Sequence, residues 1–373
     1  MKLIAQVKLQ PTEQQADALK RTMEAANRAA NFLSTIAWDM QQFGQYDLHH
    51  LAYYAIRAQF DLSAQMTVRV IAKVADAYKL DKKTRRTFRP LGSVAYDSRI
   101  LAWKIENCSV SIWTLDGRIK LPFAAGEHQL DRLTTSQGEA DLIFREGAFY
   151  LYQTCDIEEP AADQPVAFLG IDLGIVNIAT TSDGETFSGA QVESTRQRHA
   201  HRKAKLQKVG TLSAKRRLRK LSGQQKRFQK DTNHKIARKI VETAKGTYRG
   251  IALEELGGIR DRITVRRGQR ARHANWSFFQ LRQYIDYKSR LAGVVVQLVD
   301  PRNTSKTCSV CGHCERANRP SRDEFRCCNC GHAAPADYNA ALNISARAAV
   351  LQPIVSDADV APYSVAPETS PRL

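Results

Sequence analysis

The spacing of apolar residues predicts a β-rich region near the start of the chain that a block of helices interrupts. Residues 1–10 alternate between apolar and polar positions, as a half-buried strand does. From Pro11 to about residue 80, apolar residues recur every three or four positions, which is typical of amphipathic helices. Alternation returns over residues 94–155, where Asp116-Gly117 is a hairpin turn signal. We therefore predict a small antiparallel β barrel or sandwich that carries a helical insertion.

Strands and helices alternate in the second half of the chain, beyond a Pro-bearing linker at residues 158–165. Apolar strands are expected in VAFLGIDLGIVNIATTSDG, YRGIALEEL and GVVVQLVD, with a long basic helical region between the first two segments. A helix is expected from about Phe278 to Leu291, and a last helix begins near Asp337. This alternation predicts an α/β fold with a partly parallel sheet. Residues 351–373 lack periodicity and are expected to be disordered.

A cluster of cysteines predicts a metal site. Four of them form two Cys-x-x-Cys pairs separated by about fifteen residues, which is the spacing of a zinc ribbon. Cys308, Cys311, Cys327 and Cys330 would bind one tetrahedral zinc ion, and the glycine after each pair permits the tight turn. Four protein ligands leave no open coordination position, so we predict a structural zinc; a redox or iron cluster is the alternative.

Three acidic residues are candidates for metal binding, although each of them also has an ordinary structural interpretation. Asp172 lies inside an apolar strand, Glu254 is near the end of another, and Asp337 opens the last helix just after the cysteines. Taken singly, they fit an edge-strand or turn residue, a solvated strand end and a helix N-cap. Together, carboxylates on neighbouring strands and a nearby helix can bind two Mg²⁺ ions, which activate water for phosphodiester hydrolysis. This combination is typical of a nuclease.

The charge balance favours a polyanionic partner. The chain of 373 residues has 56 Lys and Arg against 38 Asp and Glu, a formal net charge of +18. Such a surplus attracts nucleic acid phosphates or anionic lipid; a solubilising or ribosome-associated role is the plain alternative. No run approaches the roughly 18 apolar residues that span a bilayer, and the first residues lack a signal-peptide core. We expect a cytoplasmic protein without a membrane partner.

Basic residues gather in particular segments. Nineteen Lys and Arg face two acids between Arg196 and Arg249, an imbalance that favours phosphate contacts over the alternative of an exposed charged helix. A basic loop at 260–276 follows Glu254, with Trp276 expected to be buried, and a shorter basic run at 82–89 is a further candidate contact. The residues that we expect to bind nucleic acid are Lys215, Arg216, Arg217, Arg219, Lys220, Lys226, Arg227, Arg266, Arg267, Arg270 and Arg272.

These motifs resemble the TnpB (OrfB) family encoded by bacterial insertion sequences, relatives of the type V CRISPR effectors. The resemblance rests on GIDLGIVNIATTSDG, on IALEELGGI, and on NTSKTCSVCGH followed by FRCCNCGHAAPADYNAALNI, which agree in order, spacing and type. It implies an RNA-guided DNA endonuclease with a split RuvC-like, RNase H-type nuclease domain. Asp172, Glu254 and Asp337 would be its catalytic acids and Mg²⁺ ligands, whereas Glu255 would not bind metal.

The resemblance also implies parts, partners and cofactors. Guide RNA and target DNA are the implied partners, one structural Zn and two catalytic Mg the implied cofactors, and a monomer is favoured. The alternatives are a nuclease-inactive RNA-guided DNA-binding regulator, which the intact acids disfavour, and a DNA transposase acting in strand transfer. The expected parts are a wedge-like β barrel (1–10 and 91–160), a helical recognition insertion (11–90), a RuvC-like nuclease domain (166–302 and 333–350), a zinc ribbon (303–332) and a disordered tail (351–373).

Overall fold

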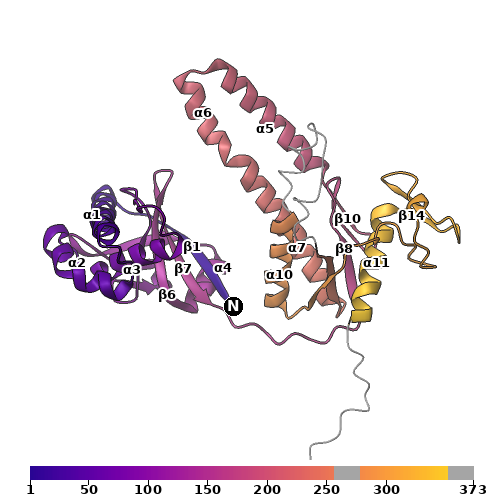
Figure 1. Ribbon diagram of the computed structural model, residues 1–373, viewed down its shortest axis with the longest axis horizontal. Coiled ribbons are helices and arrows are strands. Elements are labelled where there is room, and N and C mark those ends of the chain that lie inside the picture. Colours follow the sequence, from indigo (N-terminus) through magenta and orange to yellow (C-terminus); the bar gives the residue numbers. More distant parts are fainter. Residues whose placement is uncertain (256–277, 352–373) are drawn as a thin grey trace, which may run out of the picture. The chain divides into compact units, whose positions relative to one another are not determined.

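The computed structural model describes residues 1–255 and 278–351, which fall into two compact units that divide after Glu158 (Figure 1). No helix among the described residues is long and apolar enough to cross a membrane. The tail predicted at residues 351–373 lies outside the described residues, apart from Leu351, which ends the last helix. The basic loop at 260–276 lies outside them as well.

The N-terminal unit is built on a seven-stranded antiparallel sheet, nearly closed like a barrel, with the strand order β2-β6-β7-β1-β5-β4-β3. The first strand pairs with β7 from Lys2↔Asp156 to Lys8↔Tyr150, and with β5 at Leu9↔Phe123. The chain thus leaves the sheet after its first strand and returns to it about 85 residues later. The strands are β1 (Lys2–Leu9), β2 (Val94–Tyr96), β3 (Leu101–Lys104), β4 (Ser109–Thr114), β5 (Gly117–Ala124), β6 (Ser136–Arg145) and β7 (Ala148–Asp156).

Three helices fill the long connection from β1 to β2. Thr12 caps the first of them, because its side chain accepts a hydrogen bond from Gln15 N while the Gln15 side chain bonds back to Thr12 N, a complete capping box. Ser63 caps the third in a similar way. The helices of this unit are α1 (Glu13–Asp39), α2 (Gln45–Phe60), α3 (Ala64–Leu80), the short η1 (Ile105–Asn107) and α4 (Glu127–Thr134).

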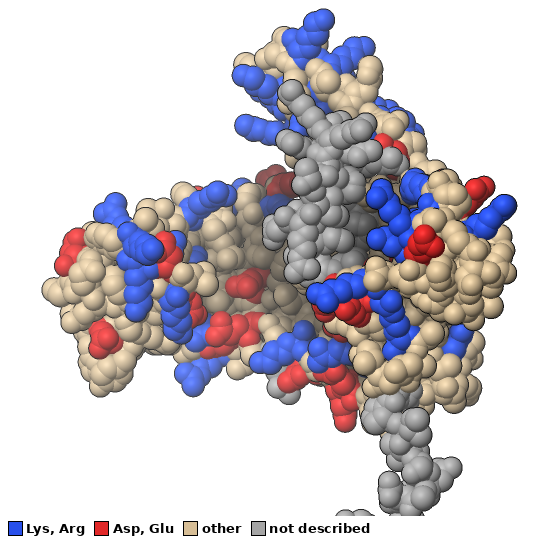
Figure 2. All heavy atoms as spheres, turned by 45° about the vertical axis from the view of Figure 1, so that its right-hand side comes forward, with Lys and Arg blue, Asp and Glu red and all other residues tan. Residues whose placement is uncertain are grey.

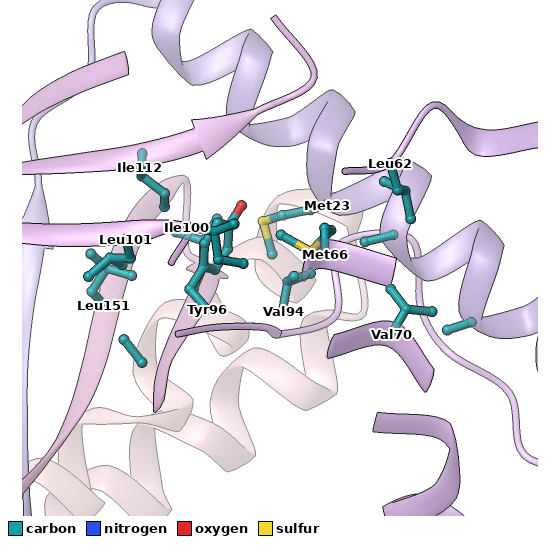
Figure 3. Packing of buried hydrophobic residues seen from close by; sticks show 14 of the residues in the cluster. Met23, Leu62, Met66, Val70, Val94, Tyr96, Ile100, Leu101, Ile112 and Leu151 are labelled. Carbon is teal, nitrogen blue, oxygen red and sulfur yellow. The ribbon is translucent and has the colours of Figure 1, made fainter. Parts of the chain in front are cut away.

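The core of the N-terminal unit forms between these helices and the sheet. Met23 of α1 and Met66 of α3 lie against Val94 and Tyr96 of β2, and all four are fully or almost fully buried (Figure 3). Met fills irregular gaps well, which suits a contact between helices and a curved sheet. The amphipathic spacing that predicts these helices therefore marks core positions.

The C-terminal unit contains a five-stranded mixed sheet in the order β10-β9-β8-β11-β12. Strands β8, β11 and β12 are parallel, and β9 and β10 run antiparallel at one side. The partly parallel α/β architecture predicted from the sequence is confirmed. The strands are β8 (Phe168–Asp172), β9 (Asn177–Thr181), β10 (Thr186–Ser188), β11 (Gly250–Glu254) and β12 (Val296–Val299), and a separate two-stranded sheet pairs β13 (Glu324–Arg326) with β14 (Ala333–Pro335).

Helices cover both faces of this sheet. Leu169 and Ile171 of β8 join the cluster formed with α7 and α10, whereas Phe168 packs on the other side with Ile344 and Ala348 of α11. Helix α5 runs away from the sheet, and α6 and α7 lead the chain back to it (Figure 1). The helices of this unit are α5 (Ala190–Val209), α6 (Leu212–Ser222), α7 (Gln224–Gly246), α10 (Phe278–Ala292), the short η2 (Arg316–Asn318) and α11 (Ala336–Leu351).

Helix α11 approaches β8 so closely that Gly170 is required between them. A β-carbon at Gly170 would overlap the carbonyl oxygen of Ala341 and lie 2.6 Å from the backbone nitrogen of Ser345. Ser345 Oγ adds a 2.6 Å hydrogen bond to the carbonyl of Phe168. The backbone of the helix thus lies directly on the strand, where only a glycine fits.

Replacing Gly170 by Ala should lower the free energy of unfolding by about 3 kcal/mol, because the new methyl group meets backbone and not a movable side chain. The matched control is Gly246→Ala at the end of α7, where a β-carbon would meet nothing within 4 Å and stability should be unchanged or slightly raised. Urea denaturation of both variants measures the difference; equal midpoints would contradict the proposed close packing.

Candidate functional site

The three acids singled out in the sequence lie at one edge of the C-terminal sheet. Asp172 and Glu254 are the last residues of β8 and β11, which pair in parallel, so their carboxyl ends meet at the same edge. Asp337 lies in the first turn of α11, the helix that packs on β8. Asp172 is within electrostatic reach of both other carboxylates. The structure therefore brings together residues that are up to 165 positions apart in the chain.

The electrostatics of this edge are those of an acidic site whose negative charge is only partly compensated. Burial raises the pKa of Asp172 to about 7, and the negative charges of Glu254 and Asp337 add to the rise. Burial also raises the pKa of Glu254, although a hydrogen bond from Thr304 opposes it. A buried carboxylate is costly unless a cation or hydrogen bonds compensate it. The site consequently has a strong electrostatic demand for positive charge.

Hydrogen bonds orient two of the acids. Thr304 Oγ1 donates to Glu254 Oε1 at 2.5 Å, and Asn177 Nδ2 donates to Asp337 Oδ2 at 2.8 Å. Asn343 of α11 in turn donates to the carbonyl of Thr304 at 2.8 Å, which holds the threonine in place. Each of these carboxylates thus has one oxygen engaged by the protein.

The two adjacent glutamates have different partners. Arg282 of α10 donates to both oxygens of Glu255, at 2.7 and 3.1 Å. Side chains of consecutive residues point to opposite sides of an extended chain, so Glu254 and Glu255 diverge. The bidentate ion pair fixes Glu255 toward α10, and Glu254 is the one that contributes to the charge around Asp172.

One cation near the acids is not apparent from the sequence. The positive charge of Arg319 acts on Asp172 and opposes the rise in its pKa. Arg319 is half-buried just after η2, between the two cysteine pairs, and its Nη2 donates to the carbonyl of Arg322 at 2.8 Å. Several arginines occur in this segment, and no pattern distinguishes the one that folds toward the acids. The position between the two cysteine pairs limits the candidate cations to a few arginines, and only the fold distinguishes Arg319 among them.

The four predicted zinc ligands form a cluster. Of the residues that the structure describes, they alone make a group of three or more potential metal ligands whose atoms all lie within 4.8 Å of one another; the three carboxylates are spread more widely. The Sγ atoms are 3.5 Å apart for Cys311 and Cys327 and 3.7 Å apart for Cys308 and Cys330. A tetrahedral ion with Zn–S bonds of about 2.3 Å needs separations of about 3.8 Å, so the cluster fits zinc.

The two cysteine turns have the same backbone geometry. Gly312 and Gly331 have φ angles of 73° and 74°, and each donates to the first cysteine of its pair at 3.0 Å. A positive φ is readily adopted only by glycine, which explains the residue after each pair. The remaining cysteines of the segment, Cys314 and Cys328, are exposed and lie outside the cluster.

Basic side chains cover the outer helices of the unit. The seven predicted nucleic-acid-binding residues on α6 and α7 are exposed. Helices α5, α6 and α7 form an arm, and Figure 2 shows Lys and Arg gathered at its upper end. None of the seven forms an ion pair with another described residue, so their charges are available to a partner. They are Lys215, Arg216, Arg217, Arg219, Lys220, Lys226 and Arg227. The predicted contacts Arg266, Arg267, Arg270 and Arg272, and Trp276, lie outside the described residues.

Comparison with known proteins agrees with this fold. The chain superimposes on a cryo-EM structure of a Cas12f1–sgRNA–target DNA complex with a TM-score of 0.64 at 16% identity, over 90% of this chain and 83% of that one. The fold is therefore Cas12f-like. Residues 151–256 match the OrfB_IS605 family model, described as a probable transposase, and residues 278–344 match the Cas12f1-like TNB domain. Two segments of the C-terminal unit thus resemble OrfB-type and Cas12f1-like proteins.

Three curated relatives illustrate the range of the family. The chain is 31% identical over 244 residues to the CRISPR-associated endodeoxyribonuclease Cas12f1 of Sulfoacidibacillus thermotolerans. The aligned region covers 59% of this chain and 56% of the relative. It is 32% identical over 128 residues to the TnpB-like protein MJ0751 of Methanocaldococcus jannaschii (34% and 45%). It is 28% identical over 285 residues to a putative RNA-guided DNA endonuclease of Streptomyces pristinaespiralis (72% and 64%). The chain thus spans about half the length of the first of these relatives.

Loss of one cysteine ligand should release the metal. We expect about one zinc ion per chain, and Cys311→Ser should lower this content strongly because three thiolates bind zinc less tightly than four. Cys328→Ser removes an exposed cysteine outside the cluster and should keep the zinc. Elemental analysis of the purified proteins decides; equal zinc content in Cys311→Ser and the unaltered chain would rule out a four-cysteine site.

The acidic edge should make the zinc-loaded protein, in the absence of Mg²⁺, less stable at neutral than at acidic pH. The pKa of Asp172 is about 7 in the fold against 3.8 when unfolded, so between these values the folded state alone keeps the proton. The free energy of unfolding therefore falls as pH rises through this window. Asp172→Asn should remove the dependence and raise the melting temperature at about pH 8.

Asp183 is the matched control for this measurement, because the fold lowers its pKa where it raises that of Asp172. Its ion pair with Arg249 holds the pKa of Asp183 below its usual range, so Asp183→Asn should lower the melting temperature at the same pH. Thermal unfolding of the two zinc-loaded variants and the unaltered chain without added Mg²⁺, at about pH 5 and 8, makes the comparison. A destabilised Asp172→Asn at pH 8 would mean that Asp172 is already compensated within the protein.

Proposed function

We propose that the protein is an RNA-guided DNA endonuclease that hydrolyses phosphodiester bonds at the edge formed by Asp172, Glu254 and Asp337. The observation that carries the proposal is the convergence of three carboxylates, one of them with its pKa raised to about 7, beside the cysteine cluster. A buried acidic group without enough cations is a poor structural element and a good metal site. The names of the relatives, an endodeoxyribonuclease and an RNA-guided DNA endonuclease, support the same reaction.

The donor set of this edge fits two Mg²⁺ ions. Magnesium prefers carboxylate oxygens and retains several waters, so three carboxylates suit it without a complete cage of protein ligands. When bound, such ions supply activation of water and neutralisation of charge on the phosphate. In this proposal Asp172, Glu254 and Asp337 hold the ions, and no covalent enzyme intermediate is formed.

The neighbouring residues of the chain position these groups. Thr304 and Asn177 each engage one carboxylate oxygen and so restrict the rotation of Glu254 and Asp337. In this proposal Arg319, whose positive charge acts on Asp172, donates to the non-bridging oxygens of a bound phosphodiester, because a guanidinium matches phosphate geometry. Glu255 is held by Arg282 and takes no part in metal binding.

The cysteine cluster has a structural role in this proposal. Four thiolates saturate a zinc ion, which leaves no position for water or substrate. Asn339 of α11 donates to the carbonyl of Thr307 at 2.8 Å and accepts from Ser309 N at 3.1 Å, directly beside the first ligand, Cys308. The zinc would therefore stabilise the segment that also carries Thr304 and Arg319.

Guide RNA and target DNA are the proposed partners. The exposed cations of α6 and α7 form a basic arm, and base pairing between guide and target would supply the sequence specificity. We assign the β barrel and its helices to the wedge and recognition roles and the mixed sheet to the RuvC-like nuclease. The boundaries given under Sequence analysis, together with a monomeric state, belong to this proposal.

A DNA transposase that acts in strand transfer is a second candidate, since the family model matched by residues 151–256 is described as a probable transposase. Both reactions can use the same acids, but only a transposase joins a DNA end to a target strand. An assay for strand joining separates them, and we expect hydrolysis alone.

Replacing Asp172 by Ala should lower guide-dependent DNA cleavage by about 100-fold or more, because a ligand of the proposed metal site is lost. Binding of guide and target should persist, which distinguishes a nuclease from a binding-only regulator. Glu255→Gln is the matched control and should retain cleavage, since this glutamate pairs with Arg282. Cleavage by Asp172→Ala at the original rate would overturn the proposal.

A further inference from the structure

In the N-terminal unit, residues 85–92 lie against α1 and are held there by side chains instead of a neighbouring strand. Asn31 accepts a hydrogen bond from Phe88 N at 2.8 Å and donates to the carbonyl of Phe88 at 2.9 Å. Ser34 Oγ donates to the carbonyl of Arg86 at 2.6 Å. The residues bonded to the helix are two apart, as in the ladder between two antiparallel strands.

The ladder continues toward the start of α1. Asn27 Nδ2 donates to the carbonyls of Pro90 and Gly92, at 3.1 and 3.0 Å, and Lys73 Nζ bonds to Asn27 Oδ1 at 2.7 Å, which fixes the orientation of the amide. Four helical residues advance about 6 Å and two extended residues about 6.6 Å. Side chains one helical turn apart therefore match alternate residues at Arg86 and Phe88. Beyond Arg89 the chain turns, with Gly92 N bonded to the Arg89 carbonyl at 2.9 Å, and Asn27 holds this turn.

Exposure alternates along the held segment. Arg85, Thr87 and Arg89 are exposed, whereas Arg86 and Phe88 between them are half-buried. Arg86 pairs with Asp81 at 3.1 Å, but the structure gives the side chains of Arg85 and Arg89 no ion pair or hydrogen bond with a described residue. The backbone that carries these two arginines is thus held in place, and four residues of extended chain separate their Cα atoms by about 13 Å.

We propose that Arg85, Thr87 and Arg89 form a rigid strip that binds the phosphodiester backbone of a nucleic acid. This surface rests on the proposed function and adds a backbone contact outside the nuclease site. Guanidinium groups and a hydroxyl all donate to phosphate oxygens, and such contacts position a nucleic acid without reading its sequence. The ladder on α1 orders the strip in advance, so little conformational entropy is lost on binding.

The test compares salt dependence of binding for the full chain, in buffer without added Mg²⁺. The probes are a labelled single-stranded RNA and a labelled DNA duplex of equal length, over about 50 to 200 mM salt. For Arg85→Gln/Arg89→Gln, the slope of log affinity against log salt should fall by about 1.8 on the duplex or about 1.4 on the single strand. The probe that shows the fall identifies the source of the backbone. Lys2→Gln/Lys104→Gln removes two exposed charges of the same unit and should leave both slopes unchanged.

A second variant tests the role of the ladder. Asn31→Leu keeps both arginines but frees the peptide group of Phe88, so affinity should fall while the slope is retained. If the unaltered chain binds neither probe, the proposed function and the strip both fail. If it binds but the slopes of Arg85→Gln/Arg89→Gln match those of the unaltered chain on both probes, the strip alone is overturned.

Discussion

The close contact between α11 and β8 is the constraint on which the C-terminal unit depends. Because Gly170 has no side chain, the backbone of α11 lies directly on the strand, and Ser345 bonds to the strand carbonyl. This contact places the first turn of the helix, with Asp337, beside the end of β8, with Asp172. One backbone approach thus brings two of the three acids together.

The same helix also links the acids to the cysteine cluster. Its buried Asn343 bonds to the carbonyls of Thr304 and Thr307, and Thr304 in turn bonds to Glu254. A movement of the cysteine segment would therefore change the position of Glu254, to which it is linked through the hydrogen bonds of Thr304. Buried amides that satisfy main-chain carbonyls are costly to remove, since the unpaired group would stay desolvated. We regard α11 as the element that couples metal-dependent folding of the cysteines to the geometry of the acidic edge.

The acidic edge lowers the stability of the fold at neutral pH, because it places carboxylates close together in a buried site. Burial and mutual repulsion raise the pKa of Asp172 to about 7, so without bound cations the folded protein keeps a proton on this group up to near-neutral pH. Arg319 compensates only in part. The N-terminal unit differs: its polar residues Asn27, Asn31 and Ser34 all have hydrogen-bond partners and hold a connecting segment against α1. These polar groups of the first unit fix the conformation of the chain, whereas the three acids of the second unit retain negative charge that the protein compensates only in part.

Much of the architecture follows from local pattern. Alternation and helical spacing predict the barrel-like sheet, its helices and α10, which runs from Phe278 to Ala292, because each depends on side chains a few residues apart. Cysteine spacing predicts the cluster for the same reason: two residues between ligands and a following glycine are local requirements. Other features depend on residues distant in sequence that meet only when packed. The pairing of Glu255 with Arg282, the position of Arg319 near Asp172 and the ladder that exposes Arg85 and Arg89 are of this kind. The sequence by itself determined which residues could bind metal or phosphate; only the tertiary structure decided which of them are buried, paired or exposed, because burial and pairing depend on long-range contacts.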